Sequence, residues 1–228
     1  MKPLVITGPS ANSGKTELAC QLLRRHPGIQ VLKITRFHRE SHCPVHSPAE
    51  DHCDGCDDTP AGYEIVADDS RIKVAGKDTG RLAEAGGEPV LWLRAAPHAF
   101  NYALKAALAR FNADEPLLIE GNSAATQDWL DATVVLIWPQ HPKGVKASVL
   151  PALRRADRLI LIESSTAPGK RVPPSLVQAC NRIGISLAQL PYPEWLSAFW
   201  WKAGQMQPVD ENLIGGISSA LTSGVRTR

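Results

Sequence analysis

The stretch from Leu4 to Leu23 reads LVITGPSANSGKTELACQLL, and it contains the strongest motif of the chain. An apolar run of strand character leads into the segment Gly8–Thr16, and a helix-forming run follows it. A strand, a glycine-bounded loop, Gly-Lys-Thr and a helix, in this order, are the context of a phosphate-binding Walker A loop. The stretch therefore predicts a binding site for a nucleoside triphosphate.

Each part of this loop has an expected role. Backbone N–H groups at the start of the helix would bind phosphate oxygens, assisted by the helix dipole. The Lys15 ammonium would reach the terminal phosphates, and the Thr16 hydroxyl would bind Mg²⁺. The predicted nucleotide contacts are Gly8, Ser10, Asn12, Ser13, Gly14, Lys15 and Thr16 in the loop, with Lys33 and Arg81 outside it. On the Mg²⁺ side we expect Glu120, which ends an apolar run; the alternative is a carboxylate that merely ends a strand.

Short apolar runs alternate with longer segments of helical spacing along the chain. We expect strands at Pro3–Thr7, Gln30–Ile34, Val90–Leu93, Leu117–Glu120, Thr133–Trp138, Leu159–Ile162 and Ile185–Leu190, and helices at Lys15–Arg25, Pro97–Phe111 and Pro174–Ile183. Such alternation predicts an α/β fold of P-loop NTPase type, a doubly wound, mostly parallel sheet with helices on both faces. A hairpin of Tyr63–Val66 and Arg71–Val74 is also expected. The nucleotide-binding domain would span residues 1–207, followed by a tail over 208–228.

The composition narrows the class of protein and its compartment. A net charge of +2 over 228 residues gives no reason to expect a nucleic acid or an anionic membrane as partner. No apolar run approaches the roughly 20 residues of a membrane span, and the N-terminus does not resemble a secretory signal. We therefore expect a cytoplasmic protein, in which clustered cysteines bind metal or do redox chemistry more often than they form disulfides.

A polar insertion, residues 38–69, follows the second expected strand and contains HCPVHSPAEDHCDGC at positions 42–56. Cys43, Cys53 and Cys56 supply three soft ligands, and His46 is the favoured fourth because it repeats the two-residue spacing of Cys53–Cys56. This set fits a structural Zn²⁺ or an iron–sulfur cluster. Other fourth ligands are His42, His52 and His38. Free thiols and a redox dithiol at Cys53 and Cys56 are the alternatives to a metal.

Two further segments carry a resemblance to known families. Val31–His38 reads VLKITRFH, and Gly76–Gly87 reads GKDTGRLAEAGG. Together with the phosphate loop and Glu120-Gly121, they resemble the molybdopterin-guanine dinucleotide biosynthesis adaptor (MobB) family over roughly the first 125 residues. Five residues separate Gly8 from Gly14, a loop spacing similar to that of dethiobiotin synthetase and the cobyrinic-acid amide-forming enzymes. The adaptor resemblance implies a dimeric, GTP-binding accessory protein with weak hydrolysis.

Two functions follow as expectations. The first is an accessory protein, binding GTP or ATP, for biosynthesis or delivery of a metal cofactor, with a protein partner and a homodimeric state. The second is an ATP-dependent small-molecule kinase or ligase of the dethiobiotin synthetase and cobyrinate synthase class. In the second case Lys33, Asp78 and Arg81 would contact the substrate or the transferred phosphate, with Asp78 among the catalytic groups. A metal-sensing switch is a third alternative. The base stays open, because no Asn-Lys-x-Asp motif is present.

Overall fold

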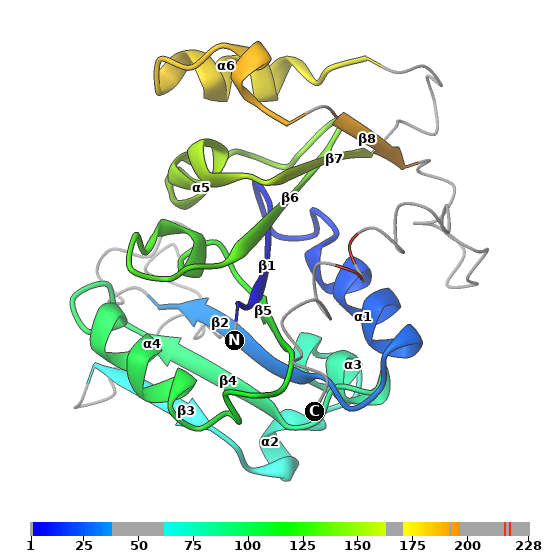
Figure 1. The fold of residues 1–228 in the computed structure, drawn as a ribbon, viewed down its shortest axis with the longest axis vertical. Helices are drawn as coiled ribbons and strands as arrows, with labels where there is room; N and C mark the ends of the chain where they lie inside the picture. Colours follow the sequence, from blue (N-terminus) through cyan, green and yellow to red (C-terminus); the bar gives the residue numbers. More distant parts are fainter. Residues whose placement is uncertain are drawn as a thin grey trace, which may run out of the picture.

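The computed structural model describes residues 2–37, 62–162, 171–191, 193–196, 217 and 219, and it is built on one eight-stranded sheet (Figure 1). The strand order across the sheet is β3-β4-β2-β5-β1-β6-β7-β8. The strands are β1 (Leu4–Thr7), β2 (Gln30–Arg36), β3 (Tyr63–Val66), β4 (Val90–Ala95), β5 (Leu117–Glu120), β6 (Thr133–Pro139), β7 (Arg158–Ile162) and β8 (Pro193–Leu196).

All strand pairs are parallel except β3 with β4. A parallel neighbour requires a crossover connection, and helices supply most of these connections. The helices are α1 (Lys15–Arg25), α2 (Asp69–Ile72), α3 (Asp78–Glu84), α4 (Phe100–Leu108), α5 (Leu150–Arg155) and α6 (Pro174–Arg182), with 3₁₀ turns η2 (Ala124–Thr126), η3 (Ala147–Val149) and η4 (Leu187–Gln189). The expected α/β class with a mostly parallel sheet is confirmed.

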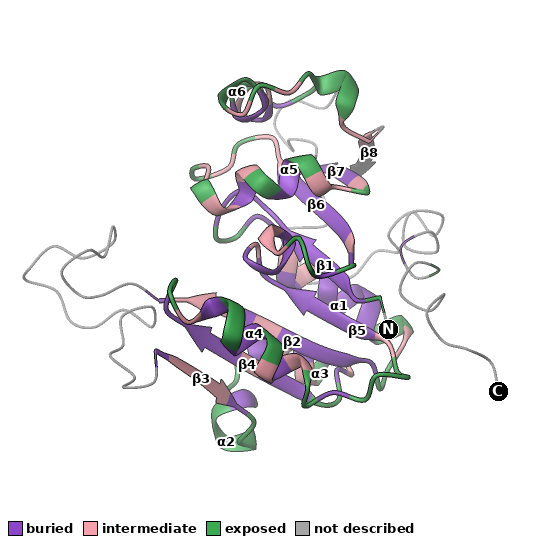
Figure 2. Ribbon diagram, turned by 60° about the vertical axis from the view of Figure 1, so that its left-hand side comes forward, coloured by how far each residue is buried: buried purple, intermediate pink, exposed green. Residues whose placement is uncertain are grey.

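Two hydrophobic cores lie on the two faces of the sheet, and buried residues run through the strands between them (Figure 2). On one face α4, α5 and α6 pack against the sheet through residues such as Leu104, Leu153 and Leu176. On the other face α1, α2 and α3 contribute residues such as Leu22 and Leu82. Burial on both faces explains why the central strands are almost continuously apolar. Ile217, within the predicted tail, is fully buried in the core of the α1 face.

Helix α3 approaches the turn before it very closely. A Cβ added at Gly80 would lie 2.2 Å from the carbonyl oxygen of Val74, so no side chain fits there. The turn is further held by the Lys77 amide, which donates to the same carbonyl over 3.2 Å. Glycine at position 80 thus permits α3 to pack directly on the end of the α2 segment.

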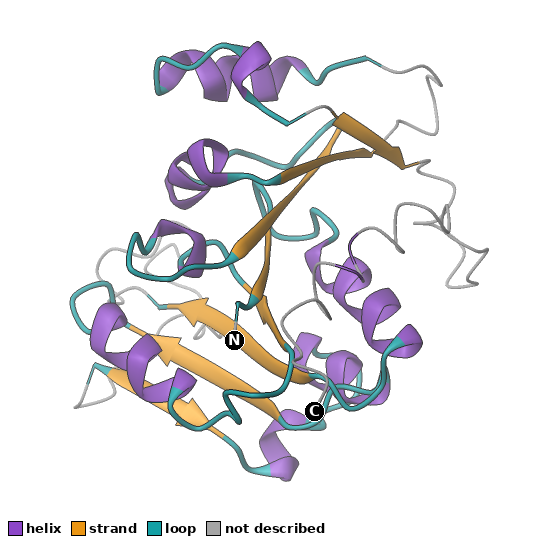
Figure 3. Ribbon diagram, viewed as in Figure 1, coloured by secondary structure: helices purple, strands orange, loops and turns teal. Residues whose placement is uncertain are grey.

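Two expected elements are wrong (Figure 3). Arg71–Val74 does not form the second strand of a hairpin, because Asp68 caps α2 by accepting a hydrogen bond from the Ser70 amide over 2.8 Å. Strand β3 pairs instead with β4 and closes one edge of the sheet. The stretch Ile185–Leu190 is not a strand either. Ser186 begins the turn η4 with a capping box that includes the Gln189 side chain.

The insertion predicted over 38–69 is described only from residue 62 onward, and there it enters the fold through β3 and the start of α2. Cys43, His46, Cys53 and Cys56 lie outside the described residues, so the loop metal stays a prediction. The same holds for most of the tail over 208–228. Among the helices that the structure describes, none is both long and apolar enough to span a membrane.

Candidate functional site

The segment Gly8–Gly14 forms a tight loop between β1 and α1, at the carboxyl edge of the sheet. Its backbone takes left-handed conformations at Asn12, with a φ of 55°, and at Gly14, with a φ of 99°. A Cβ at Gly8 would lie 2.4 Å from the Ser13 hydroxyl oxygen and 3.1 Å from the Ile137 carbonyl oxygen, so a side chain here would displace the Ser13 hydroxyl from its position in the loop. Close approach of the loop to itself explains the glycines at its two ends.

The Asn122 side chain anchors the start of this loop. The Gly8 amide donates to Asn122 Oδ1 over 3.0 Å, and Asn122 Nδ2 donates to the Gly8 carbonyl over 2.9 Å. The same Nδ2 lies 3.3 Å from the Ser148 hydroxyl. One side chain therefore satisfies both backbone groups of Gly8 and connects the loop to the chain after β5 and after β6.

Lys15 begins α1, and its ammonium has only neutral hydrogen-bond partners among the described contacts. Nζ lies 2.7 Å from the Ser10 carbonyl oxygen and 3.1 Å from the Ser13 hydroxyl. The Ser13 hydroxyl itself donates to the same carbonyl over 2.9 Å. In addition, the Ser10 hydroxyl is buried without a hydrogen-bond partner. The loop thus presents a cation and a spare hydroxyl, the groups with which an anion is bound.

Thr16 and Glu120 meet beside this loop. Strand β5 lies between β1 and β2, and Glu120 is aligned with Ile6 on one side and Lys33 on the other. The Thr16 hydroxyl lies 3.1 and 3.0 Å from the two carboxylate oxygens of Glu120, whose side chain is only 1% exposed. The two predicted Mg²⁺ ligands are therefore brought together by strand order and helix start.

Lys33 and Asp78 complete this cluster. Lys33 Nζ lies 2.6 Å from Glu120 Oε1 and 2.6 Å from Asp78 Oδ2, so one ammonium joins two carboxylates. Asp78 comes from the first turn of α3 and is half exposed, whereas Lys33 is largely buried. We call Thr16, Lys33, Asp78 and Glu120 the site network. It gathers residues from α1, β2, α3 and β5.

The charges of the site network change the ionisation of its members. Burial alone would lower the pKa of Lys33, but the carboxylates of Glu120 and Asp78 outweigh it and raise that pKa. For Asp78, burial opposes ionisation, yet the Lys33 charge and hydrogen bond lower its pKa. Burial, with repulsion from Lys33 and Lys146, lowers the pKa of Lys15 to about 8. An anion bound beside Lys15 would relieve this repulsion.

Arg81, a predicted nucleotide contact, points to a different partner. Its Nη2 lies 2.6 Å from Glu17 Oε2, and this ion pair joins α3 to α1. Cys20, on the same helix as Glu17, donates its thiol to the Arg81 carbonyl over 3.4 Å. Burial raises the pKa of Cys20 to about 11. Cys20 and Cys180 are both buried, as expected of small apolar residues.

The donors of the site network suit Mg²⁺ chemically. A threonine hydroxyl and two carboxylates are hard oxygen ligands, which Mg²⁺ prefers, and it keeps waters and nucleotide phosphates in its remaining positions. Within the described part of the chain, no group of three or more His, Cys, Asp or Glu side chains could hold a metal by itself. The network therefore fits a cation shared with a phosphate ligand rather than one enclosed by protein.

Sequence reasoning missed two features of the site. Asn122 directly follows the Glu120-Gly121 pair, but nothing in the local sequence predicts that its side chain binds both backbone groups of Gly8. Lys146 lies 131 positions after Lys15 and reaches the loop only through the fold. Its backbone N–H donates to the Pro9 carbonyl over 2.8 Å.

Comparison of the chain with models of known protein families finds no match, and comparison with curated proteins finds none either. The geometry of the site and the motifs of the sequence are therefore the observations from which a function can be proposed.

Proposed function

We propose that the protein binds a nucleoside triphosphate with Mg²⁺ at Gly8–Thr16 and serves as an accessory protein in the biosynthesis or delivery of a metal cofactor, of the molybdopterin-guanine dinucleotide type. One observation carries the nucleotide part. The Lys15 ammonium has neutral partners only, directly beside the Thr16–Glu120 pair. A cation that is hydrogen-bonded only to neutral groups, next to a carboxylate–hydroxyl pair, is what a phosphate–Mg²⁺ ligand requires.

The phosphates would lie against the loop. The Ser10 hydroxyl, buried without a partner, and the Lys15 ammonium are donors for phosphate oxygens. The first amides of α1 have no acceptor within the helix and add donors of the same kind. Burial lowers the pKa of Lys15 to about 8 although the charges of Glu120 and Asp78 oppose this, and a phosphate beside Lys15 would stabilise the ammonium further.

Mg²⁺ would be held by Thr16 and Glu120, with Asp78 close by. The ion supplies charge neutralisation of the phosphates, and Glu120 keeps the Thr16 hydroxyl oriented toward it. Lys33 pairs with both carboxylates and would position them in the free protein, and its single charge leaves them a net negative charge for Mg²⁺. Hydrolysis, if it occurs, would be weak without a further group that orients the attacking water.

The accessory role is supported by the resemblance of Val31–His38 and Gly76–Gly87 to the adaptor family. Within it, the Cys/His loop would bind Zn²⁺ or an iron–sulfur cluster, and the working unit would be a homodimer with a protein partner. Both GTP and ATP remain candidates. Elemental analysis and an absorption spectrum on protein purified without oxygen test the loop. One zinc per chain or a brown iron–sulfide protein supports a metal, whereas no metal contradicts it.

Nucleotide binding is tested by titrating the protein with ATP and with GTP, each with Mg²⁺ and with a chelator. Saturable binding that Mg²⁺ tightens supports the proposal, and preference for one base settles the nucleotide. Lys15→Ala should abolish the signal. Binding of neither triphosphate by the folded wild-type protein would refute the nucleotide site.

The kinase or ligase alternative is favoured by the convergence of Lys33 and Asp78 on the Thr16–Glu120 pair. Cationic and carboxylate groups at this place could bind an acceptor and the transferred phosphoryl group. Phosphate release distinguishes the two functions. A large acceleration by the protein-free small-molecule fraction of a cell extract favours the enzyme. Slow release that only the protein fraction accelerates favours the accessory role.

A further inference from the structure

The segment after β6, residues 140–149, ends in η3 and lies against the phosphate loop. The Lys146 amide donates to the Pro9 carbonyl over 2.8 Å, which sets its Cα beside the loop. Lys146 has an extended backbone at the N-terminus of η3, with a φ of −65° and a ψ of 139°. A main-chain hydrogen bond of this kind persists whatever side chain occupies the position.

A second connection sets the same register. Asn122 Nδ2 lies 3.3 Å from the Ser148 hydroxyl and also donates to the Gly8 carbonyl. Ser148 is two residues from Lys146, so the segment is attached to the loop on both sides of the lysine stem: through the Lys146 amide to Pro9 and through Ser148 to Asn122. The position of Lys146 relative to Lys15 is therefore determined by the fold.

The charge at this position has no counterpart nearby. Among the described residues, no ion pair or side-chain hydrogen bond is present for Lys146, which is exposed. Lys15 begins α1 at the other end of the same loop, so the backbones of both lysines are held beside Gly8–Gly14. Two like charges brought together by the backbone are stabilised when an anion binds between them.

We propose that Lys146 is a second phosphate-binding lysine, supplied by the segment after β6 and contacting the polyphosphate of the bound nucleotide. This inference rests on the proposed nucleotide site and adds a residue to it. The distance from Pro9 is short enough for the flexible four-carbon stem to reach over the loop, and lysine acts on phosphate as a point charge.

The experiment compares Mg²⁺–triphosphate affinity for wild type, Lys146→Ala, Lys146→Arg and Lys143→Ala. Lys143 is the matched control, since it is an exposed lysine of the same segment and, among the described contacts, its backbone is not bonded to the loop. We expect Lys146→Ala to weaken binding about tenfold and to flatten its dependence on salt, because a phosphate contact by an ammonium is screened by salt. Lys146→Arg should retain most of the affinity, and Lys143→Ala should change it less than about twofold.

Several outcomes decide the matter. Unchanged affinity in Lys146→Ala overturns the inference, and so does an equal loss in Lys143→Ala, which would indicate a general surface potential. Inorganic triphosphate, used as a second probe, should show the same loss, because the contact does not involve the base or the sugar; no loss with this probe also overturns it. An unchanged melting temperature excludes a structural cause. If wild type itself binds no triphosphate, it is the proposed nucleotide site that fails.

Discussion

Two ionic clusters lie on the α1 face of the sheet, and they are built from different chemistry. The site network joins Glu120 to Thr16 through one hydroxyl and to Lys33 through one ammonium. The edge network joins Glu64 of β3 to Arg94 of β4 and Arg71 of α2, with both Arg71 terminal nitrogens bonded to the carboxylate. Arg94 Nη1 lies 3.1 Å from Glu64 Oε2.

This difference in the contacting groups indicates which cluster can exchange partners. A guanidinium matches a carboxylate in a planar, two-point geometry, and such pairs hold elements together. An ammonium and a hydroxyl make one-point contacts that water or Mg²⁺ can replace without a change of backbone. We therefore expect the site network to respond to ligands and the edge network to stabilise the β3–β4–α2 corner.

The largest expected effect comes from Lys15→Ala, which removes the cation of the loop. We expect triphosphate affinity to fall about 100-fold or more, since a charge-assisted contact to phosphate is lost. Stability should change little, because Lys15 bonds only to neutral groups of its own loop. Calorimetric titration measures the affinity, and the metal content of the Cys/His loop should stay unchanged.

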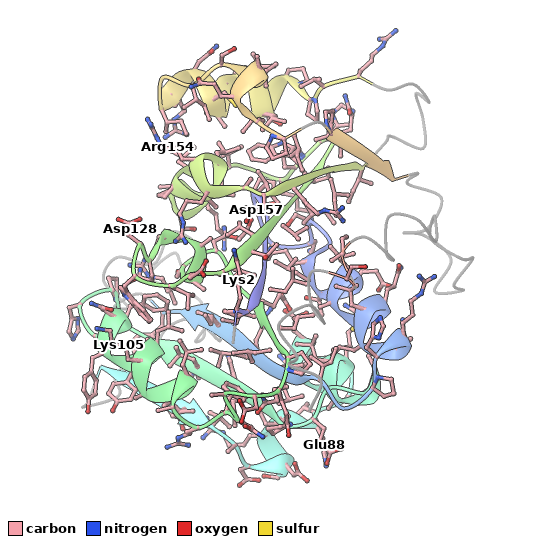
Figure 4. All side chains as sticks on the ribbon, in the orientation of Figure 1. Lys2, Glu88, Lys105, Asp128, Arg154 and Asp157 are labelled. Atoms are coloured by element: carbon pink, nitrogen blue, oxygen red, sulfur yellow. The ribbon has the colours of Figure 1, made fainter. Side chains whose placement is uncertain are left out.

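Lys105→Ala is the control for this variant. Lys105 lies on α4, on the opposite face of the sheet from α1 (Figure 4), and its ammonium stacks 5.0 Å from the Trp129 ring centroid. The affinity of the Lys105→Ala variant for the triphosphate should equal that of wild type. Full binding by Lys15→Ala would contradict the assignment of the loop.

Glu120→Gln should remove the effect of Mg²⁺ on nucleotide affinity. We expect Mg²⁺ to tighten binding about tenfold in wild type and not at all in the variant, because a neutral amide is a weak Mg²⁺ ligand. The measurement is the affinity with Mg²⁺ and with a chelator. Glu64→Gln, the same change in the edge network, should keep the full Mg²⁺ effect. Loss of the Mg²⁺ effect in both variants, or in neither, would contradict the assignment of Mg²⁺ to the site network.

Glu64→Gln should instead lower the free energy of unfolding by about 2 kcal/mol, because it removes the carboxylate shared by Arg94 and Arg71. This loss of stability is smaller than that expected for a fully buried ion pair, because the Glu64 side chain is 28% exposed. Urea unfolding measures it. Loss of nucleotide affinity in the folded variant, with no loss of stability, would reverse the roles of the two networks.

The smallest effect is a pH dependence that involves neither network. The Cys20 thiol has a pKa of about 11 in the folded protein against an ordinary value of 9.0. Between these values the unfolded chain loses the proton and the native protein keeps it, so stability falls as pH rises from 9 to 11. At pH 10 the contribution is about 1 kcal/mol.

Cys20→Ala should lack this contribution. The stability difference between wild type and variant should therefore shrink by that amount between pH 8 and pH 10, as followed by denaturant unfolding at each pH. A constant difference over this range would mean that the Cys20 thiol is not buried as described.

Much of the fold could be predicted from periodicity and motif. The helix Lys15–Arg25 and the strand Leu117–Glu120 have the predicted bounds, because a long apolar pattern and a glycine-bounded loop dominate local structure there. The errors at Arg71–Val74 and Ile185–Leu190 arose where Asp68 and Ser186 cap helical turns. In both places local side-chain hydrogen bonds, one at Asp68 and two in the capping box of Ser186, outweighed an apolar pattern of only four to six residues.

The candidate site was predictable only where its residues form a continuous motif. Lys15 and Thr16 follow from the loop itself, and Glu120 from the end of an apolar strand. The meeting of Lys33 with Glu120 depends on β2 and β5 being neighbours, which strand order decides and local sequence does not. Arg81 was expected at the phosphate from its position and charge, but its pairing with Glu17 depends on the packing of α3 on α1.

Gly80 lies at the contact between α3, which carries Asp78, and the turn that follows α2, which carries Arg71. Because α3 rests on the Val74 carbonyl with no space between them, α3 cannot slide along the turn that joins it to α2. Asp78 follows Val74 in the chain and Arg71 precedes it, so the helical turn that carries Arg71 would have to accommodate any shift of α3. We therefore expect the backbone amides of α2 to report the binding of a ligand that moves Asp78.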